Sequence, residues 1–239
     1  MDTARIAELL QPFLTAPVLS TSCHSEPPSC HSERSEESAV LTPAQLQNIS
    51  TYIDLLLRWN ARINLTAIRQ PEEIVTRHFG ESLFAARHLF QPEPASAPTR
   101  LIDVGSGAGF PGLPIKVWAT LIHATLIESN QKKATFLREV IRALTLTDIN
   151  VFPGRAEAYS NPPADVVTLR AVEHFDQTLP IATRLVAPGG RLALLITEAQ
   201  LGRTHDLTPD FTWSNPLNIP HSSSRRLLIG HKNLQAHES

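Results

Sequence analysis

A glycine-rich stretch, "DVGSGAGFPGLP", runs from Asp103 to Pro114, directly after the apolar pair Leu101–Ile102. Glycines in such a turn let a ligand approach the backbone, because no side chain blocks it. The spacing G-x-G-x-x-G at Gly107, Gly109 and Gly112 is typical of dinucleotide-binding turns, but by itself it is a weak signal. The stretch therefore predicts a binding loop without identifying its ligand.

Two carboxylates accompany this loop. Glu128 follows it by about 20 residues, where a carboxylate accepts hydrogen bonds from the ribose hydroxyls of NAD or of S-adenosylmethionine alike. The alternative for Glu128 is a solvated acid at a helix N-terminus. Asp103 favours S-adenosylmethionine, because a carboxylate attracts its cationic amino-acid part, directly or through water, and repels a phosphate. Pro111 and Pro114 point the same way, since they remove N–H groups that a pyrophosphate would use.

Short apolar runs alternate with helical patterns after the loop begins. The predicted strands are Leu101–Val104, Ala124–Glu128, Asn150–Pro153, Val166–Leu169, Leu192–Ile196 and Arg226–Ile229. The predicted helices are Leu113–Thr120, Gln131–Leu144 and Gln177–Leu185, with a tight turn at Ala187–Gly190. This alternation indicates a doubly wound, mostly parallel sheet. Ligands bind at the carboxyl ends of such strands, which places the site near Gly105, Glu128, Arg155–Glu157 and Arg170.

Helical patterns also precede the sheet. A short amphipathic helix is expected within the first 14 residues, and a second begins at Thr42, a typical N-cap, with Pro43 at its first position. A third is expected from about Pro71 to Phe90, followed by a proline-rich linker, Gln91–Arg100. We therefore expect an N-terminal helical region over residues 1–97 and a sheet domain over residues 98–239.

The composition limits the class of protein. The chain has 239 residues, 42% of them hydrophobic, which suffices for one good-sized core. No window has the roughly 18 apolar residues of a membrane span, and the first residues do not have the pattern of a signal peptide. The formal net charge of −2 does not by itself indicate a nucleic-acid partner. A cytoplasmic protein without structural disulfides is the simplest interpretation.

A foreign segment occupies about residues 20–40. The unit Cys-His-Ser-Glu occurs twice in it, at Cys23–Glu26 and Cys30–Glu33, among residues with almost no apolar side chains. Zinc binding by these cysteines and histidines is one reading, but adjacent Cys-His pairs suit a tetrahedral site poorly. The composition favours a disordered insertion. Four glutamates against one arginine give this segment −3, so the rest of the chain carries +1.

Several ordered motifs resemble one known family. These are W-N-x-x-x-N-L-T at Trp59–Thr66, R-H at Arg77–His78, the glycine loop, F-L-R at Phe136–Arg138, G-R-A-E at Gly154–Glu157 and L-R-A at Leu169–Ala171. Together they resemble the bacterial 16S rRNA guanine-N7 methyltransferases, RsmG, formerly called glucose-inhibited division protein B. The resemblance is strong from Ser50 to about Gly190. It implies a class I S-adenosylmethionine-dependent methyltransferase sheet with a small N-terminal helical cap.

The resemblance also implies a substrate and a set of contacts. The expected reaction moves the methyl group of S-adenosylmethionine to N7 of a guanine in 16S rRNA, in the small ribosomal subunit or its precursor. The family's cofactor contacts fall on Gly105, Phe110, Ala156, Glu157 and Arg170. The sheet argument adds Asp103, Gly107 and Glu128. N7 carries a lone pair and no proton, so in-line placement is most of the work, and we expect no catalytic base and no metal. A monomer is expected.

The sequence departs from the family pattern in two places besides the insertion. Glu81 stands where the family usually has Asp, and Glu198–Ala199 stands where a lysine-glycine pair is common. The absence of this lysine removes a positive charge near the expected mouth of the site, which puts RNA contacts in doubt more than cofactor binding. Alternatives stay open for individual residues: Arg170 could pair with Glu157 instead of placing a ligand, and Trp59 could be a core anchor or stack on a base.

An RNA-facing rim is expected on the helices beside the site. Its candidates are Arg58, Arg62, Arg69, Arg77, Lys132, Lys133, Arg138 and Arg142. Helix charges also commonly form a merely solvated face. Two other functions remain open: an NAD(P)-dependent oxidoreductase using the same loop, and a non-catalytic RNA-binding assembly protein with the same fold.

Overall fold

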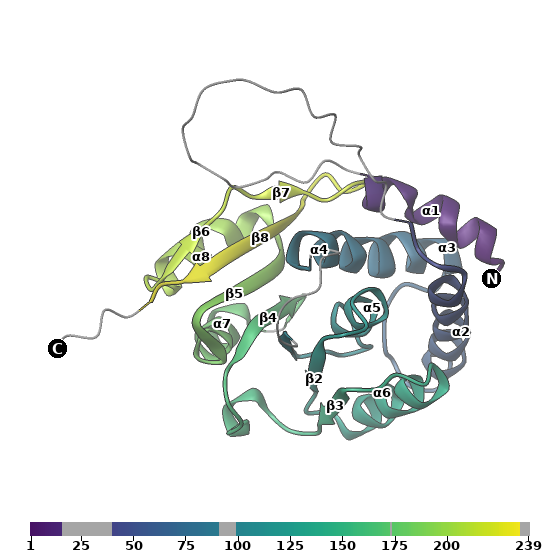
Figure 1. Cartoon of the computed structure of the whole chain (residues 1–239), viewed down its shortest axis with the longest axis horizontal. Coiled ribbons are helices and arrows are strands. Elements are labelled where there is room, and N and C mark those ends of the chain that lie inside the picture. Colours follow the sequence, from purple (N-terminus) through teal and green to yellow (C-terminus); the bar gives the residue numbers. More distant parts are fainter. Residues whose placement is uncertain (16–39, 91–98, 173, 235–239) are drawn as a thin grey trace.

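The six predicted strands belong to one eight-stranded sheet in the computed structural model, which describes residues 1–15, 40–90, 99–172 and 174–234 (Figure 1). Its strands are β1 (Arg100–Val104), β2 (His123–Ile127), β3 (Ile149–Phe152), β4 (Ala164–Arg170), β5 (Val186–Thr197), β6 (Phe211–Trp213), β7 (Leu217–Asn218) and β8 (Arg225–Lys232). The order is β3-β2-β1-β4-β5-β8-β6, with β7 also paired to β8. The mostly parallel sheet predicted from the sequence is confirmed.

Strands β1 to β5, which lie in the sheet in the order β3-β2-β1-β4-β5, run parallel to one another. Strand β8 pairs antiparallel with β5. The crossovers carry α5 (Gly112–Trp118), α6 (Gln131–Ala143) and α7 (Phe175–Arg184). Strand order reverses between β1 and β4, because β2 lies on one side of β1 and β4 on the other. A crevice outside the carboxyl ends of the strands is expected at such a switch point.

The end of the sheet is where the sequence prediction was incomplete. The predicted turn at Ala187–Gly190 lies inside β5, which begins at Val186 and not at Leu192. The pairing with β4 shifts there, from Ala164–Val186 to Val166–Arg191, and Gly189 has a φ of +73°. The elements α8 (Leu201–Leu207), β6 and β7 were not predicted. All three elements are short. The two strands form only by pairing with β8, and a local sequence pattern does not reveal such a pairing.

The N-terminal helices begin and end close to the predicted limits. They are α1 (Thr3–Thr15), α2 (Pro43–Asn60), α3 (Pro71–Ile74) and α4 (Glu81–Leu89), with a π-helical turn, η1 (Val75–Gly80), between the last two. Thr42 caps α2 as expected: its hydroxyl accepts from Gln45 N at 3.2 Å, and the Gln45 side chain accepts from Thr42 N at 2.8 Å. The predicted insertion lies outside the described residues, as does most of the predicted linker.

Alternation along the strands divides the apolar side chains between two faces of the sheet. Leu101 of β1 contributes to a cluster with α5, α6 and the N-terminal helices, whereas Ile102 contributes to a cluster with α7. Figure 1 shows α7 across the sheet from α5. The first cluster also holds Ile6 of α1 and Ile53 of α2, so the helical region and the sheet share one core. No helix in the described part of the chain has the length and apolarity to span a bilayer.

Candidate functional site

A cavity of about 660 Å³ opens at the carboxyl ends of the central strands. Seven of the eight predicted site residues line it: Gly105, Gly107, Phe110, Glu128, Ala156, Glu157 and Arg170. They come from the segments after β1, β2 and β3 and from the end of β4. The parallel sheet therefore brings together residues that lie far apart in the sequence.

The glycine loop after β1 is folded on itself by hydrogen bonds. The amides of Ser106, Gly109 and Phe110 donate to main-chain oxygens of Ile127 or Ser106. Those of Gly107 and Gly112 donate to the carboxylates of Glu128, at 2.8 Å, and Asp103, at 3.2 Å. Gly105 and Gly107 have φ values of +68° and +58°, which favour glycine. Five amides of the loop are thus already paired inside the protein.

Glu128 follows β2 and is largely buried. Its Oε2 accepts from Gly107 N, and its Oε1 accepts from Asn130 N at 2.7 Å. A carboxylate offers about four lone-pair sites, so each oxygen keeps capacity for another donor. The alternative of a solvated acid is therefore wrong for Glu128: the residue fixes the loop and also faces the cavity.

Asp103 is the one predicted residue that does not line the cavity. Its side chain is 0% exposed, and its oxygens accept from Thr168 Oγ1 at 2.7 Å and from Gly112 N. Burial raises the pKa of this carboxyl to about 6, against the opposing effect of its hydrogen bonds. Asp103 lies on the face of β1 that packs under α5, so its visible role is to hold the start of that helix to the sheet.

Arg170 ends β4 and pairs with Glu81, not with Glu157. Its Nη2 lies 3.0 Å from Glu81 Oε2 and also donates to the carbonyl of Arg77 at 2.7 Å. Glu81 Oε1 also forms ion pairs with Arg77 Nε, at 3.3 Å, and with Arg225 Nε, at 3.4 Å. The alternative pairing with Glu157 is wrong, because the helical region supplies a buried carboxylate that a local pattern does not reveal. Within the described chain, Arg170 Nε has no acceptor.

His78 contacts Arg170, and both side chains line the cavity. Its Nδ1 is 3.2 Å from both terminal nitrogens of Arg170, and its Nε2 is 2.8 Å from Thr66 Oγ1. Burial, and then the nearby arginines, lower the pKa of His78 to about 3, so the ring is neutral near pH 7. The ring stacks on Phe110 at 4.6 Å, and Phe110 stacks on Tyr52 at 5.4 Å on its other side. Phe110 is thereby fixed in place.

The sequence prediction missed the segment Leu65–Thr66 as part of the cavity wall. Asn60 shapes it: the Asn60 side chain accepts from the amides of Leu65 and Thr66 and donates to the carbonyl of Thr66. This explains physically why W-N-x-x-x-N-L-T contains an asparagine at its second position. The motif itself was the available signal, although it carried only a resemblance and no chemistry.

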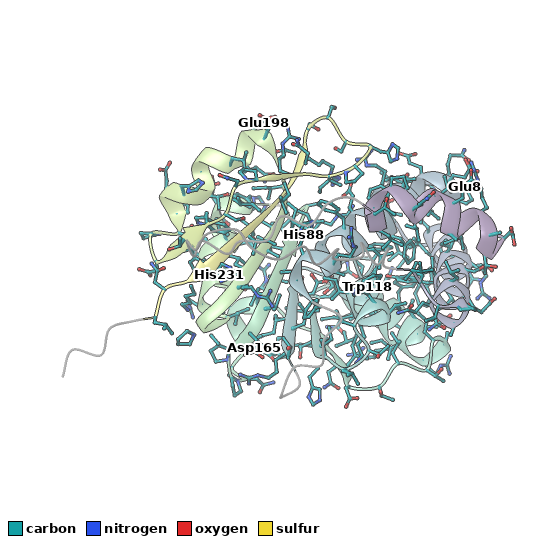
Figure 2. The ribbon with its side chains drawn as sticks, turned by 45° about the horizontal axis from the view of Figure 1, so that its top comes forward. Glu8, His88, Trp118, Asp165, Glu198 and His231 are labelled. Carbon is teal, nitrogen blue, oxygen red and sulfur yellow. The ribbon has the colours of Figure 1, made fainter. Side chains whose placement is uncertain are left out.

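Glu198 lies away from the cavity. Its side chain is 67% exposed on the outer surface (Figure 2), and it pairs with Arg226 at 3.0 Å. It is not among the residues that line the cavity. The expectation that Glu198 removes a positive charge from the mouth of the site is therefore not supported by its position.

A second cavity, of about 320 Å³, lies between the end of α2 and the start of α6. It is lined by Arg58, Trp59, Arg62, Ile63, Lys132 and Glu139. Trp59 is half-buried, with its ring 5.7 Å from that of Phe136, so it is anchored in the core and also faces this cavity. The next residue after Lys132, Lys133, lines the first cavity, which makes the two cavities neighbours.

The side chains that commonly bind metals are scattered over the described ranges. Within those ranges, no three or more His, Cys, Asp or Glu side chains gather in an arrangement that could hold a metal ion. The cysteines and histidines of the predicted insertion lie outside those ranges.

Several solved structures have a similar fold. TYW2 of P. horikoshii in complex with MeSAdo matches with a TM-score of 0.52 at 16% identity, covering 66% of this chain and 63% of that one. The YcgJ protein of Bacillus subtilis matches with a TM-score of 0.52 at 11% identity, over 66% of this chain and 100% of that one. At these identities the likeness concerns the fold.

Sequence comparison is more specific. Ribosomal RNA small subunit methyltransferase G of Chloroflexus aggregans is 39% identical over 201 residues, which is 79% of this chain and 82% of that protein. The protein of the same name from Roseiflexus sp. is 42% identical over 208 residues, 79% of this chain and 84% of that protein. The family model described as rRNA small subunit methyltransferase G matches residues 45–228. The chain therefore belongs to the rRNA small subunit methyltransferase G family.

Proposed function

We propose that this protein transfers the methyl group of S-adenosylmethionine to N7 of a guanine in 16S rRNA. The observation that carries the proposal is the state of the glycine loop. Five of its amides are paired inside the protein, while the buried carboxylate of Glu128 keeps hydrogen-bonding capacity toward the cavity. Such a site suits a ligand with ribose hydroxyls and no pyrophosphate.

The residues present fit S-adenosylmethionine along the line of the strands. Glu128, after β2, would accept the ribose hydroxyls, and Ala156 and Glu157, after β3, would lie beside the adenine. Gly105 and Gly107 have no side chains to block the ligand, and their positive φ values favour glycine at both positions. The amino-acid end would then lie toward β1 and β4, near Phe110 and Arg170. Asp103 would act on this end only indirectly, through the loop and α5.

The chemistry asks little of the protein beyond placement. The cofactor, when bound, supplies a methyl group on a sulfonium, and the new bond to N7 forms as the sulfur–carbon bond breaks, giving S-adenosylhomocysteine and a cationic purine. Because N7 has no proton to lose, His78 need not act as a base, and its neutral state agrees with a positioning role. Phe110, His78 and Arg170 hold one another rigidly and would orient the reacting groups.

The second cavity supports an RNA substrate. It joins an aromatic side chain, Trp59, with the exposed cations Arg58, Arg62 and Lys132. Stacking on aromatic rings and contacts to phosphates are the usual means of holding single-stranded RNA. We further propose that the protein works as a cytoplasmic monomer on the small subunit or its precursor. The division at residue 97 into a helical cap and a methyltransferase domain stays a prediction.

A thermal-shift assay tests the cofactor assignment. S-adenosylmethionine and S-adenosylhomocysteine should raise the melting temperature, and NAD should not, because binding to the native state alone stabilises it. Stabilisation by NAD alone would overturn the methyltransferase assignment in favour of an oxidoreductase.

Mapping of N7-methylguanosine tests the substrate. Small-subunit rRNA from cells with this gene should carry one such nucleotide that is absent without it and restored by the purified protein. Cofactor binding without any gene-dependent methylation would favour the non-catalytic RNA-binding alternative.

A further inference from the structure

The hydroxyl of Thr66 occupies an unusual place in the hydrogen-bond network at the cavity wall. Its oxygen lies 2.8 Å from His78 Nε2 and accepts from Ile68 N at 3.2 Å. A hydroxyl has two acceptor sites and one hydrogen to donate. What Thr66 offers to a ligand therefore depends on which nitrogen of His78 carries the proton.

Arg170 decides the tautomer of His78. Both terminal nitrogens of Arg170 lie 3.2 Å from His78 Nδ1, and a guanidinium only donates hydrogen bonds. Nδ1 must therefore be the acceptor, and the single proton of the neutral ring is on Nε2. Nε2–H then donates to Thr66 Oγ1, so the direction of the whole chain runs from Arg170 through His78 to Thr66.

Both acceptor sites of the Thr66 oxygen are consequently used. Its own hydrogen has no acceptor among the residues that the structure describes, and Thr66 is part of the cavity lining. The backbone of Thr66 is also held in place, because the Asn60 side chain accepts from its amide and donates to its carbonyl. The network thus presents a pre-oriented donor, with no acceptor capacity left, at the wall of the cavity.

The placement of Thr66 separates it from the nucleoside end of the cofactor. The carboxylate of Glu128 and the backbone at Ala156 follow β2 and β3, on one side of β1, whereas Arg170 ends β4 on the other side. Thr66 is joined to that β4 side through His78. In the proposed function, the methyl group and the target base meet on this side.

We propose that Thr66 is a specificity-determining residue that donates a hydrogen bond to the O6 carbonyl of the target guanine. N7 and O6 of guanine are adjacent acceptors on the same edge, whereas adenine carries an amino donor in place of O6. A fixed donor beside the reacting N7 therefore favours guanine, whose O6 accepts the hydrogen bond. It disfavours adenine, whose amino group would face the hydroxyl donor of Thr66. His78 and Arg170 act as positioning residues, because they fix the direction of this donor. The inference rests on the proposed function.

Nucleotide binding to the protein saturated with S-adenosylhomocysteine tests the proposal. The probes are guanosine 5′-monophosphate and 2-aminopurine riboside 5′-monophosphate, which keeps N7 but lacks O6, titrated by NMR. The wild type should prefer the guanine nucleotide by about 3- to 10-fold, the range for one neutral hydrogen bond. Thr66→Val should lose this preference, and Thr66→Ser, which keeps the hydroxyl, should retain it.

Three results would overturn the proposal. The first is an unchanged preference for the guanine nucleotide in Thr66→Val, and the second is no such preference in the wild type. The third is weaker binding of S-adenosylhomocysteine to Thr66→Val, which would show that the Thr66 hydroxyl donates to the cofactor. If Thr66→Val does not fold, Thr66→Ala undergoes the same titrations, because the smaller side chain leaves room for water at His78. Failure of the proposed function is distinct: wild-type protein would not methylate small-subunit rRNA, whatever the titrations give.

Discussion

Arg170 Nη2 and Glu81 Oε2 lie 3.0 Å apart, although 89 positions separate the two residues in the chain. The arginine ends the fourth strand of the sheet, and the glutamate begins α4 of the helical region. Both side chains are buried, at 6% and 1% exposure. This pair therefore ties the helical region to the sheet at the edge of the cavity.

Glu81→Gln should destabilise the protein by about 3–5 kcal/mol, the range for breaking a buried ion pair by removing one partner. The reason is that Arg170 would stay buried without a counter-charge. Urea unfolding measures the effect. Glu81→Asp keeps the charge and should cost less, and Glu73→Gln, which removes an exposed pair to Arg77, should change stability by less than about 1 kcal/mol. Equal stability of Glu81→Gln and the wild type would contradict the prediction.

Glu128→Ala should weaken the binding of S-adenosylhomocysteine by about 1–3 kcal/mol, the range for hydrogen bonds to a charged acceptor. The effect has two parts, because Glu128 would bind the ribose and also holds Gly107 N. Isothermal titration calorimetry measures the affinity. Gly105→Val should cost more, since Gly105 has a φ of +68° and an added Cβ would lie 3.1 Å from Val172 Cγ1.

Glu139→Ala is the matched control for that prediction. Glu139 is a carboxylate on α6 that lines the second cavity and not the first. Its removal should leave the affinity for S-adenosylhomocysteine unchanged. Normal affinity in both Glu128→Ala and Gly105→Val would rule out this placement of the cofactor.

His78 should make the protein less stable as the pH falls below 6.5. Its pKa is lowered to about 3 in the folded protein, so between pH 6.5 and 3 the unfolded chain binds a proton that the folded chain does not. Stability then falls by about 1.4 kcal/mol per pH unit for one such proton. Asp103 has the opposite effect between about pH 4 and 6, because its pKa is raised to about 6 and the folded state holds the extra proton.

The contribution of His78 is isolated by comparing the wild type with His78→Gln in urea unfolding at several pH values. Glutamine does not titrate, so the variant should lose less stability on going from pH 6.5 to 5. Asp103 is present in both proteins and its effect cancels in the difference. Parallel pH profiles of the two proteins would show that His78 is not held neutral by the fold.

Reversal of Lys132 and Lys133 to Glu should weaken the binding of small-subunit rRNA and flatten its salt dependence. The log–log slope should fall by about 0.7 for each phosphate of single-stranded RNA that the protein no longer neutralises. Filter binding between low and moderate salt measures both quantities. Lys132→Glu alone should leave S-adenosylhomocysteine affinity unchanged, because Lys132 lines only the second cavity, and this separates an RNA defect from misfolding.

Arg184→Glu serves as the control for charge reversal, because Arg184 is exposed in the last turn of α7 and lines neither cavity. It should leave the salt slope close to that of the wild type. A short hairpin is expected to be a poorer substrate than an assembly particle or the small subunit. Equal turnover on an isolated hairpin would show that the protein reads local RNA sequence without a composite surface.

The sequence by itself determined the parallel sheet and most of the site. Alternating apolar runs and helical patterns predicted β1 to β4 and α5 to α7 near their observed limits, because each element carries its own periodicity. For β5 they predicted only the second half. Seven of the eight predicted site residues line one cavity. The family resemblance implied five of them, and the sheet argument added Gly107 and Glu128. They meet in one cavity because the carboxyl ends of parallel strands lie at one edge of the sheet.

Only the tertiary structure decided how the charges are paired. Asp103 contacts the start of α5 and does not line the cavity. Arg170 forms its ion pair with Glu81 and not with Glu157. Thr66 and His78 form part of the cavity wall. Each outcome depends on which face of the sheet the N-terminal helices cover, and on contacts between residues far apart in sequence. Periodicity within an element carries no information on such contacts, since they are fixed only when the helices pack on the sheet.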